Sequence, residues 1–454
     1  MLGRTAPWTL ASWAGPAIAA CAIGQGSSTS QSGPPSLAGD GGVLCTDLRC
    51  RQVDCASKGL PDTTLSGVVY DPAGRLPLYN AFAYVPNRKP DPILPGHPAC
   101  TACQAPASGS PVVWASSDAY GHFRIGGVPA GDDVPLVLQL GKWRRQIVVP
   151  HIEACQDNVL DDPRLVRLPA NGSEGDMPLI ALTTGCDAVE CFLLNLGIDP
   201  SEFTEPGGPG HVHVYAGRYP QGMTMSGIGD AYSLWASADR LAAYDVVVAS
   251  CECEVYGRDA EGPAYEAMRD YVGSGGRLYT THFHFNWFAP PTGPTDFEHV
   301  ADWLDDFAPQ GFANFFVDTT FPKGRALADW LVAANVGATY GQIPLSDTRD
   351  SVAAVSGATR WIYGADSEGS SPYETKYLSF NTPLEAAPAD RCGRATFSDV
   401  HVAGLSLAPG AFPAECSAMD DQHAGNEGAL EFLFFDLVSC IQDDSQNPAP
   451  PPLK

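Results

Sequence analysis

Positive charge is scarce in this chain. Among 454 residues, 26 Lys and Arg stand against 52 Asp and Glu, which gives a formal net charge of -26. A surface of this sign repels phosphate backbones and anionic membranes, so we expect no nucleic acid partner. Long apolar runs are missing beyond the N-terminal segment, and none approaches the roughly 18 residues of a membrane-spanning helix. We attribute the acidity to solubility.

The first residues have the form of a bacterial export signal. Arg4 supplies the positive start, an apolar stretch follows, and residues 18–21 (IAAC) fit a lipobox. Small residues before a cysteine suit cleavage and lipid attachment at that thiol. We predict a signal peptide over residues 1–21, lipidation of Cys21, and a place in the cell envelope or at the outer membrane surface, with the lipid as the only membrane contact. Because Pro16 interrupts the apolar stretch, plain secretion is the alternative.

Fourteen cysteines are many for a chain of this size, and they favour either zinc sites or disulfides. Cys100 and Cys103 have the spacing of a zinc knuckle, but no second CxxC or HxxxH follows at a suitable distance. Behind an export signal, disulfides are the better interpretation, and their pairing does not follow from the sequence. Lipidation of Cys21 would leave 13 of the 14, an odd number, so at least one thiol is expected to be unpaired within the chain.

Composition separates folded from unfolded segments. Residues 22–43 are mainly Gly, Ser and Pro and predict a flexible tether, and residues 443–454 predict a disordered tail. Between them we expect two folded domains, over residues 44–155 and 176–442, joined by a linker at 156–175. With 44% apolar and 17% charged residues, the chain has a globular composition and is long enough for each domain to bury a core.

The first domain has the pattern of short β-strands. Period-two alternation with Gly, Pro and Asp breaks runs over residues 64–149 and predicts an antiparallel β-sandwich. SSDAYGHFRIGGVPAG resembles the turn motif T-D-x-x-G-x-F-x-L-x-x-V-P-x-G of carboxypeptidase regulatory-like (transthyretin-type) domains. That resemblance implies a folding or attachment module without peptidase chemistry. The matching positions are Ser117, Asp118, Gly121, Phe123, Ile125, Val128, Pro129 and Gly131.

From Pro178 onward the pattern changes to alternating strands and helices. Buried strands are predicted at PLIALTTG, HVHVYAG, LAAYDVVVASCECE and RLYTTHFHFNWF, and GPAYEAMRDYVGSGG is a helix that ends at glycine. A late strand, CGRATFSDVHV, and a closing helix, NEGALEFLFFDLVSCI, follow. Repeated βαβ units predict a flavodoxin-like, doubly wound parallel sheet. The expected fold class is therefore an antiparallel β-sandwich followed by an α/β domain.

Three segments of this second domain resemble a known family. MRDYVGSGGRLYTTHFH, YDVVVASC and CGRATFSDVH are similar to the ThuA-like branch of the class I glutamine amidotransferase-like proteins, with Gly275, Gly276 and His282 at the family spacing and His401 one residue early. Amidotransferases place their nucleophilic cysteine where this chain has His282, which argues against glutaminase activity. The resemblance implies a link to carbohydrate metabolism. The domain order resembles that of exported multi-domain proteins of myxobacteria.

Candidate site residues follow from the strand ends, because ligands in open α/β sheets bind beyond the carboxyl ends of the strands. His211 and His213 start a strand, so we expect them at the opposite rim. Residues expected to be catalytic are His282, His401, Glu252 and Cys251. Residues expected to bind a ligand are Ser250, Thr281, His284, Trp287 and Asp399.

Three kinds of chemistry are open to this group. A Cys–His nucleophile needs a base within hydrogen-bond reach of Cys251, whereas in an exported chain a buried or disulfide-bonded cysteine is the simpler explanation. A small polar ligand or glycan could bind among the aromatic and acidic groups. A divalent metal could be held by imidazole and carboxylate groups, with His282 and His284 facing the same way on one strand. The remaining metal candidates are Asp399, His401 and Glu252.

We predict an exported protein of unassigned activity that binds a polar extracellular ligand, such as a glycan, at the strand-end cleft. The alternative is a hydrolase or sugar-modifying enzyme that uses His282, His401 and Glu252, with or without a divalent metal. No cofactor is firmly predicted. Stoichiometric metal in the purified protein, or loss of a turnover in His282→Ala, would separate the two.

Overall fold

The structure is a computed structural model. It describes residues 47–96, 107–218, 225–254, 262–290, 297–304, 313–337, 339–364, 374–402, 412–414, 416 and 424–449. These residues all belong to one compact unit, Cys45–Lys454. The predicted signal peptide, the tether, Cys21 and the Cys100–Cys103 pair lie outside the described residues. Within the described part, no helix combines the length and apolar character that crossing a bilayer requires.

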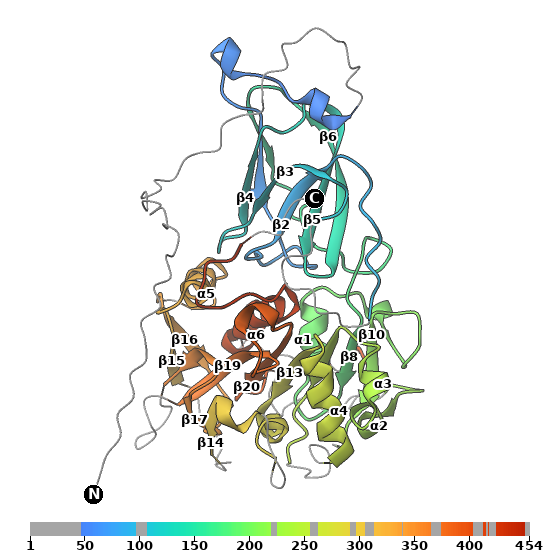
Figure 1. Ribbon diagram of the computed structural model, residues 1–454, viewed down its shortest axis with the longest axis vertical. Coiled ribbons are helices and arrows are strands. Elements are labelled where there is room, and N and C mark those ends of the chain that lie inside the picture. The colour runs from blue at the N-terminus through green and yellow to red at the C-terminus, as the bar shows by residue number, and fades with distance from the viewer. Residues whose placement is uncertain are drawn as a thin grey trace, which may run out of the picture. The chain divides into compact units, whose positions relative to one another are not determined.

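Two small sheets form the first part of the described chain (Figure 1). β1 pairs antiparallel with β4 and parallel with β7, and the other four strands pair antiparallel in the order β3-β2-β5-β6. Two short 3-10 helices precede them. The elements are η1 (Leu48–Arg51), η2 (Ala56–Lys58), β1 (Thr64–Val68), β2 (Phe82–Pro86), β3 (Pro111–Ser116), β4 (His122–Gly126), β5 (Gly131–Leu140), β6 (Trp143–Ile152) and β7 (Asp157–Leu160).

Alternation of side chains gives these strands a buried face. In β4, Phe123 and Ile125 are buried between exposed neighbours, as the period of two in a strand requires. Both belong to the same core as Leu136 and Leu138 of β5, which lies in the other sheet. The predicted β-rich first part is therefore present, with apolar side chains of its two sheets in one core.

The predicted linker at 156–175 begins inside the fold. Its first residues form β7, in which Leu160 lies opposite Gly67 of β1. Glycine permits this approach, because a Cβ at Gly67 would meet the carbonyl oxygen of Leu160 at 2.8 Å. The disulfide Cys55–Cys155 ties the chain to the same region immediately before β7. The prediction of a linker over the whole segment is wrong for residues 157–160, which extend a sheet.

A long mixed sheet forms the second part (Figure 1). Its strand order is β11-β10-β8-β12-β13-β20-β19-β18-β15-β16, with β9 paired to β10. Neighbours from β11 to β20 are parallel, and neighbours from β20 to β16 are antiparallel. The expected mixture of helices and strands is confirmed. The prediction of a wholly parallel sheet is wrong, because residues 313–382 build an antiparallel half.

The strands of this sheet are short, and a separate antiparallel pair joins β14 to β17. Their bounds are β8 (Ile180–Thr183), β9 (Phe203–Thr204), β10 (Val212–Ala216), β11 (Gly229–Asp230), β12 (Val246–Ala249), β13 (Arg277–Thr281), β14 (Ala301–Trp303), β15 (Ala313–Val317), β16 (Gln342–Leu345), β17 (Val352–Val355), β18 (Thr359–Tyr363), β19 (Thr375–Thr382) and β20 (Gly393–Ser398).

Helices cover both faces of the parallel half. Val246 and Val248 of β12 belong to a core with α1 and α6, whereas Val247 belongs to a core with α2 and α4. A strand buried on both faces is apolar throughout, which explains the sequence VVVA. The helices are α1 (Val189–Asn195), η3 (Pro200–Glu202), α2 (Ala231–Trp235), α3 (Ala238–Leu241), α4 (Gly262–Gly273), η4 (His282–Trp287), η5 (Glu298–Val300), α5 (Pro322–Ala333), η6 (Pro388–Asp390) and α6 (Ala424–Val438).

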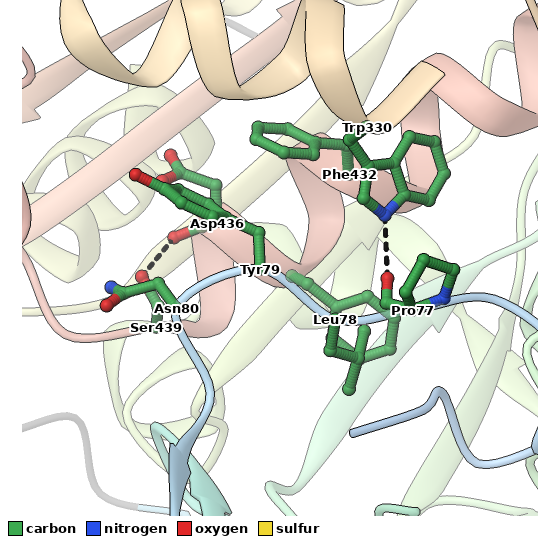
Figure 2. Close-up of a pocket in the computed structure, with 9 residues that line it drawn as sticks. Pro77, Leu78, Tyr79, Asn80, Trp330, Phe432, Asp436 and Ser439 are labelled. Carbon is green, nitrogen blue, oxygen red and sulfur yellow. Dashed lines mark hydrogen bonds between the residues drawn. The ribbon is translucent and has the colours of Figure 1, made fainter. Parts of the chain in front are cut away.

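The two parts share a core. The ring of Trp143, in β6, lies 6.1 Å from that of Phe434 and 5.8 Å from that of Phe435, both in α6. Trp330 of α5 donates its indole N–H to the carbonyl oxygen of Pro77 over 2.6 Å (Figure 2). Apolar surface of each part is thus buried against the other.

Residues beyond α6 also belong to the fold. The buried carboxylate of Asp444 lies 2.9 Å from Nζ of Lys323 and 3.0 Å from Nη2 of Arg394. Asp436 of α6 pairs with the same two cations at 2.7 Å each. These four charges can be buried together because each of them contacts a charge of opposite sign. The prediction of a disordered tail from residue 443 is therefore wrong at Asp444.

Candidate functional site

Four neighbouring parallel strands, β8, β12, β13 and β20, end at one edge of the sheet. Parallel strands deliver the residues after their carboxyl ends to that edge. Cys186 follows β8, Cys251 follows β12, His282 follows β13 and His401 follows β20. Their exposed fractions are 9%, 0%, 2% and 3%, respectively. The edge therefore gathers sulfur and imidazole groups away from solvent.

Cys251 and His282 are in direct contact. Sγ of Cys251 lies 3.4 Å from Nδ1 of His282, and the backbone N–H of Cys251 donates to Oγ1 of Thr281 over 2.8 Å. Cys251 is the free cysteine among the described residues. Burial raises the pKa of its thiol to about 12, so the protonated thiol is the stable form at neutral pH.

The backbone of His282 departs from the strand that precedes it. Its φ is 56°, in the left-handed region that few residues other than glycine adopt. β13 ends at Thr281, and His282 opens the 3-10 helix η4. The prediction that His282 and His284 face the same way on one strand is therefore wrong. Left-handed backbone at a buried polar residue is a feature that recurs at functional sites.

Arg349 fixes the position of the proton on His282. Its Nε–H donates to Nε2 of His282 over 2.7 Å. Because a guanidinium only donates and stays charged, Nε2 is the acceptor and the neutral ring carries its proton on Nδ1. Burial, His401 and Arg349 together hold the pKa of His282 well below its usual value. His282 is therefore a donor toward the sulfur of Cys251 and not a base for its proton.

His401 lies against His282 and is held by its backbone. The two ring centroids are 3.8 Å apart. The backbone N–H of His401 donates to the carbonyl oxygen of Asp347 over 3.3 Å. Its own carbonyl oxygen accepts from Nδ2 of Asn426 over 2.7 Å. The imidazole is therefore positioned from both sides by backbone hydrogen bonds.

Three charged residues of this region were not predicted from the sequence, because no periodic pattern places them near the strand ends: Arg349, Asp350 and Lys376. Arg349 lies between β16 and β17, and its backbone N–H donates to the carbonyl oxygen of Asp399 over 2.9 Å. Lys376 donates to the carbonyl oxygen of Arg349 and pairs with Asp350. The charged run SDTRD over residues 346–350 was the available signal, and only the antiparallel half of the sheet brings it to His282.

Asp399 supports this loop. Its Oδ2 accepts from the backbone N–H of Ser351 over 2.6 Å, and burial raises the pKa of its carboxyl to about 6. Glu252 points toward the end of β10, where its Oε1 accepts from the backbone N–H of Arg218 over 2.7 Å. Ser250 is buried, and its hydroxyl has no hydrogen-bond partner within the described part of the chain. Ser250 and Glu252 flank Cys251 in the sequence, and Asp399 is linked to the site through the hydrogen bond that its carbonyl oxygen accepts from Arg349.

His284 and Trp287 lie in the core rather than at a cleft. Nδ1 of His284 lies 3.2 Å from the carbonyl oxygen of Ala249, and burial lowers the pKa of His284 to about 4. Its ring and that of Trp287 both pack edge-on against Trp235, with centroids 5.6 and 5.4 Å away. Their contacts are those of packing residues.

Two other features lie at the amino edge of the strands. His211 pairs with Glu202, and Nδ1 of His213 lies 2.9 Å from the hydroxyl of Tyr244, at the rim expected for both. A cavity of about 530 Å³ is lined by the end of α4, which includes Arg269, by Phe297 before η5, and by residues 382–385 at the end of β19. Neither feature involves the predicted site residues.

Disulfides, expected from the cysteine content, are confirmed. Described pairs are Cys55–Cys155, Cys186–Cys253 and Cys191–Cys416, and Cys50, Cys392 and Cys440 are also disulfide-bonded. Within the described ranges, one group of metal-type ligand atoms gathers closely enough to share an ion. It contains His401 but none of the other predicted metal ligands, and its other members are Cys186, Cys251 and Cys253.

The chain is similar to solved structures at low sequence identity. No protein-family model matches it, and no curated protein matches it. A ThuA-like protein from Bacteroides uniformis, 9% identical, aligns over 56% of this chain and 89% of that chain with a TM-score of 0.30. A GH42 β-galactosidase from G. stearothermophilus, 12% identical, aligns over 50% and 28% with a TM-score of 0.26. Similarities at these TM-scores establish neither a family nor an activity.

Proposed function

We propose that the chain is an exported protein, anchored through Cys21, that binds a polar extracellular ligand such as a glycan at the carboxyl edge of its parallel strands. Its second part is of the ThuA-like, flavodoxin-like type and its first part a carboxypeptidase regulatory-like sandwich. The disulfides fit an oxidising compartment. The motif residues quoted above support the assignment of both parts.

One observation supports binding over thiol catalysis: the hydrogen bond from Arg349 to Nε2 of His282. A cysteine nucleophile needs a neighbouring base that can take its proton. His282 presents a donor to Cys251, and burial keeps the pKa of that thiol raised to about 12. The pair therefore lacks the activation that acyl transfer requires.

Phe283 is the aromatic side chain through which we expect a sugar to bind. It is partly exposed, directly after His282, and the guanidinium carbon of Arg349 lies 4.3 Å from its ring centroid. Arg349 covers one face of the ring, so we expect the opposite face to pack on the sugar while the cation orients sugar oxygen atoms at the ring edge.

The experiment is a glycan array probed with the purified chain lacking residues 1–21. Selective binding should be lost in Phe283→Ala and retained in Tyr120→Ala, which removes an exposed aromatic of the first part. Arg269→Ala, at the amino-edge cavity, should also retain it. Loss of binding in Arg269→Ala alone, or no selective binding by the wild-type chain, contradicts the proposal.

A hydrolase or sugar-modifying enzyme is the second candidate, because Cys251, His282 and His401 do converge. Chromogenic ester and glycoside substrates test it directly. A turnover that His282→Ala abolishes, with thermal stability unchanged, would replace the binding proposal. Retention of that turnover in His282→Ala would exclude these residues as its origin.

A further inference from the structure

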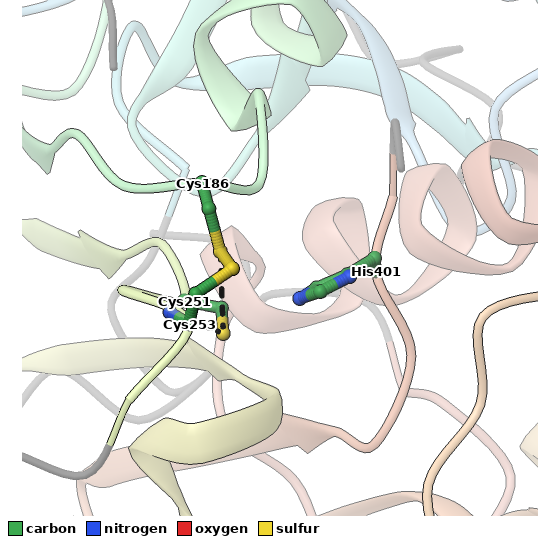
Figure 3. Close-up of side chains that lie close together, drawn as sticks. All are labelled: Cys186, Cys251, Cys253 and His401. Carbon is green, nitrogen blue, oxygen red and sulfur yellow. Dashed lines mark hydrogen bonds between the residues drawn. A yellow bond between two sulfur atoms is a disulfide. The ribbon is translucent and has the colours of Figure 1, made fainter. Parts of the chain in front are cut away.

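Three cysteines and a histidine form a compact cluster at the site edge. The Sγ atoms of Cys186, Cys251 and Cys253 and a ring nitrogen of His401 all lie within 4.8 Å of one another. Figure 3 shows the imidazole of His401 directed toward the sulfur atoms. Cys186 and Cys253 are joined in a disulfide, and Sγ of Cys251 lies 3.9 Å from that of Cys186.

We propose that reduction of the Cys186–Cys253 disulfide converts this cluster into a Cys3His site for zinc or a zinc-like divalent cation. Three thiolates and one imidazole are a donor set that structural zinc sites use, in tetrahedral geometry with Zn–S of about 2.3 Å. While the disulfide is intact the site cannot bind the metal ion, because two of the four ligand atoms are bonded to each other.

Hydrogen bonds hold the cluster together independently of the disulfide. The backbone N–H of Cys186 donates to the carbonyl oxygen of Cys251 over 2.7 Å. The side chain of Asp187 accepts from the backbone N–H of Val402 over 2.9 Å, which ties the segment after Cys186 to the segment of His401. The ligands should therefore stay near one another once the disulfide opens, and metal binding would need little further ordering.

A glycine lets the Cys186 and Cys251 segments approach each other closely. Gly185 lies so close to the Cys251 segment that a Cβ there would meet the carbonyl oxygen of Cys251 at 2.0 Å. Because the hydrogen bond from Cys186 to Cys251 holds the two backbones together, we expect the disulfide to open by rotation of the Cys186 and Cys253 side chains. This is the adjustment by which two bonded sulfur atoms become separate ligands.

The chemistry balances with an external dithiol as reductant. The dithiol gives two electrons and two protons to the disulfide, becomes a disulfide itself, and leaves Cys186 and Cys253 as thiols. On binding a divalent cation, the three thiols release three protons and His401 binds as a neutral ring. Three thiolates and one divalent metal ion have a net charge of -1. The positive guanidinium of Arg349 is close by, because it is hydrogen-bonded to the far side of the His282 ring, whose near side contacts Cys251.

Neighbouring donors are in place for a thiolate at Cys251. The backbone N–H of Cys253 donates to Sγ of Cys251 over 3.3 Å, and Nδ1 of His282 lies 3.4 Å from the same sulfur atom. Hydrogen bonds from outside the ligand set orient metal ligands and tune their affinity. His282 thus acquires a role as a positioning residue for Cys251.

Co²⁺ alone is the probe, because thiolate ligands give it an intense charge-transfer absorption. The chain lacking residues 1–21 is reduced anaerobically with a dithiol, freed of the reductant and titrated. One equivalent should bind to the reduced protein, and the oxidised protein should bind none at this site. Zinc should displace the Co²⁺ and abolish the absorption.

Variants assign the binding to this cluster. Cys251→Ser and His401→Ala should each weaken binding at least about tenfold, since ligands matter no less than their outer partners. Cys55→Ser, which removes a disulfide outside the cluster, should bind as the wild type does. Circular dichroism of the reduced chain should remain that of the oxidised chain. No binding, undiminished binding in both ligand variants, or unfolding on reduction would each overturn the proposal.

Discussion

His282 and His401 are stacked, with ring centroids 3.8 Å apart and planes inclined by 31°. Two imidazoles at this distance in a buried site oppose each other's protonation, because like charges would lie side by side without water. Arg349 adds a fixed positive charge through its hydrogen bond to His282. The edge of the sheet is therefore organised around neutral histidine, and acid should disturb it first.

Stability should fall as the pH drops below about 6.5, the ordinary histidine value. His282 and His284 have lowered pKa values in the folded state, so the unfolded chain binds more protons in this window. Each such histidine contributes a slope of about 1.4 kcal/mol per pH unit, which for His284 ends near its folded pKa of about 4. The free energy of unfolding in urea, determined at several pH values between 7 and 4.5, measures this slope. His284→Leu should reduce the slope, and an unchanged slope would refute this origin.

Arg349→Leu should raise the pKa of His282. The cation that opposes protonation is removed, and Nε2 loses its donor. NMR titration of the His282 ring signals is the measurement. Arg349→Lys keeps the positive charge and should shift the pKa less. Equal pKa values in the wild type and the leucine variant would show that burial and His401 determine the pKa of His282 without Arg349.

Cys251 should resist alkylation in the folded chain. Its side chain is buried and its thiol pKa is raised to about 12, and only the thiolate reacts. Iodoacetamide at pH 8 followed by mass spectrometry of the Cys251 peptide should show modification after unfolding in urea and little before. Rapid labelling of the native protein would indicate an activated thiol and would favour the hydrolase.

Asp444→Asn should destabilise the fold by about 3 to 5 kcal/mol, the usual result of removing one partner from a buried ion group. Lys323 and Arg394 would keep Asp436 as their remaining carboxylate. Asp443→Asn is the matched control, because that neighbouring side chain is exposed. Urea unfolding of the two variants should separate them clearly. Equal midpoints would mean that the group contributes nothing net.

Local sequence patterns predicted which residues follow the strand ends, but not the side chains and turns that surround these residues. The apolar run before Cys251, the glycines before Arg277 and the late strand before His401 placed these strand ends at one edge, and the structure does bring Cys251, His282 and His401 together. Arg349 escaped prediction because its approach depends on antiparallel pairing between β15, β16 and β18, which periodicity cannot reveal. The turn at His282 escaped as well, since a histidine at positive φ carries no sequence signal.

The core that contains Trp143, Phe434 and Phe435 couples the unfolding of the two parts. α6 (Ala424–Val438) packs on β6 from the first part, so the first part completes its packing only after α6 has been synthesised. Melting should then proceed in one cooperative step, with a single calorimetric peak for what the sequence divides into two domains. A fragment ending before residue 176 would expose Trp143 and should aggregate, and under mechanical force the two parts should unfold together.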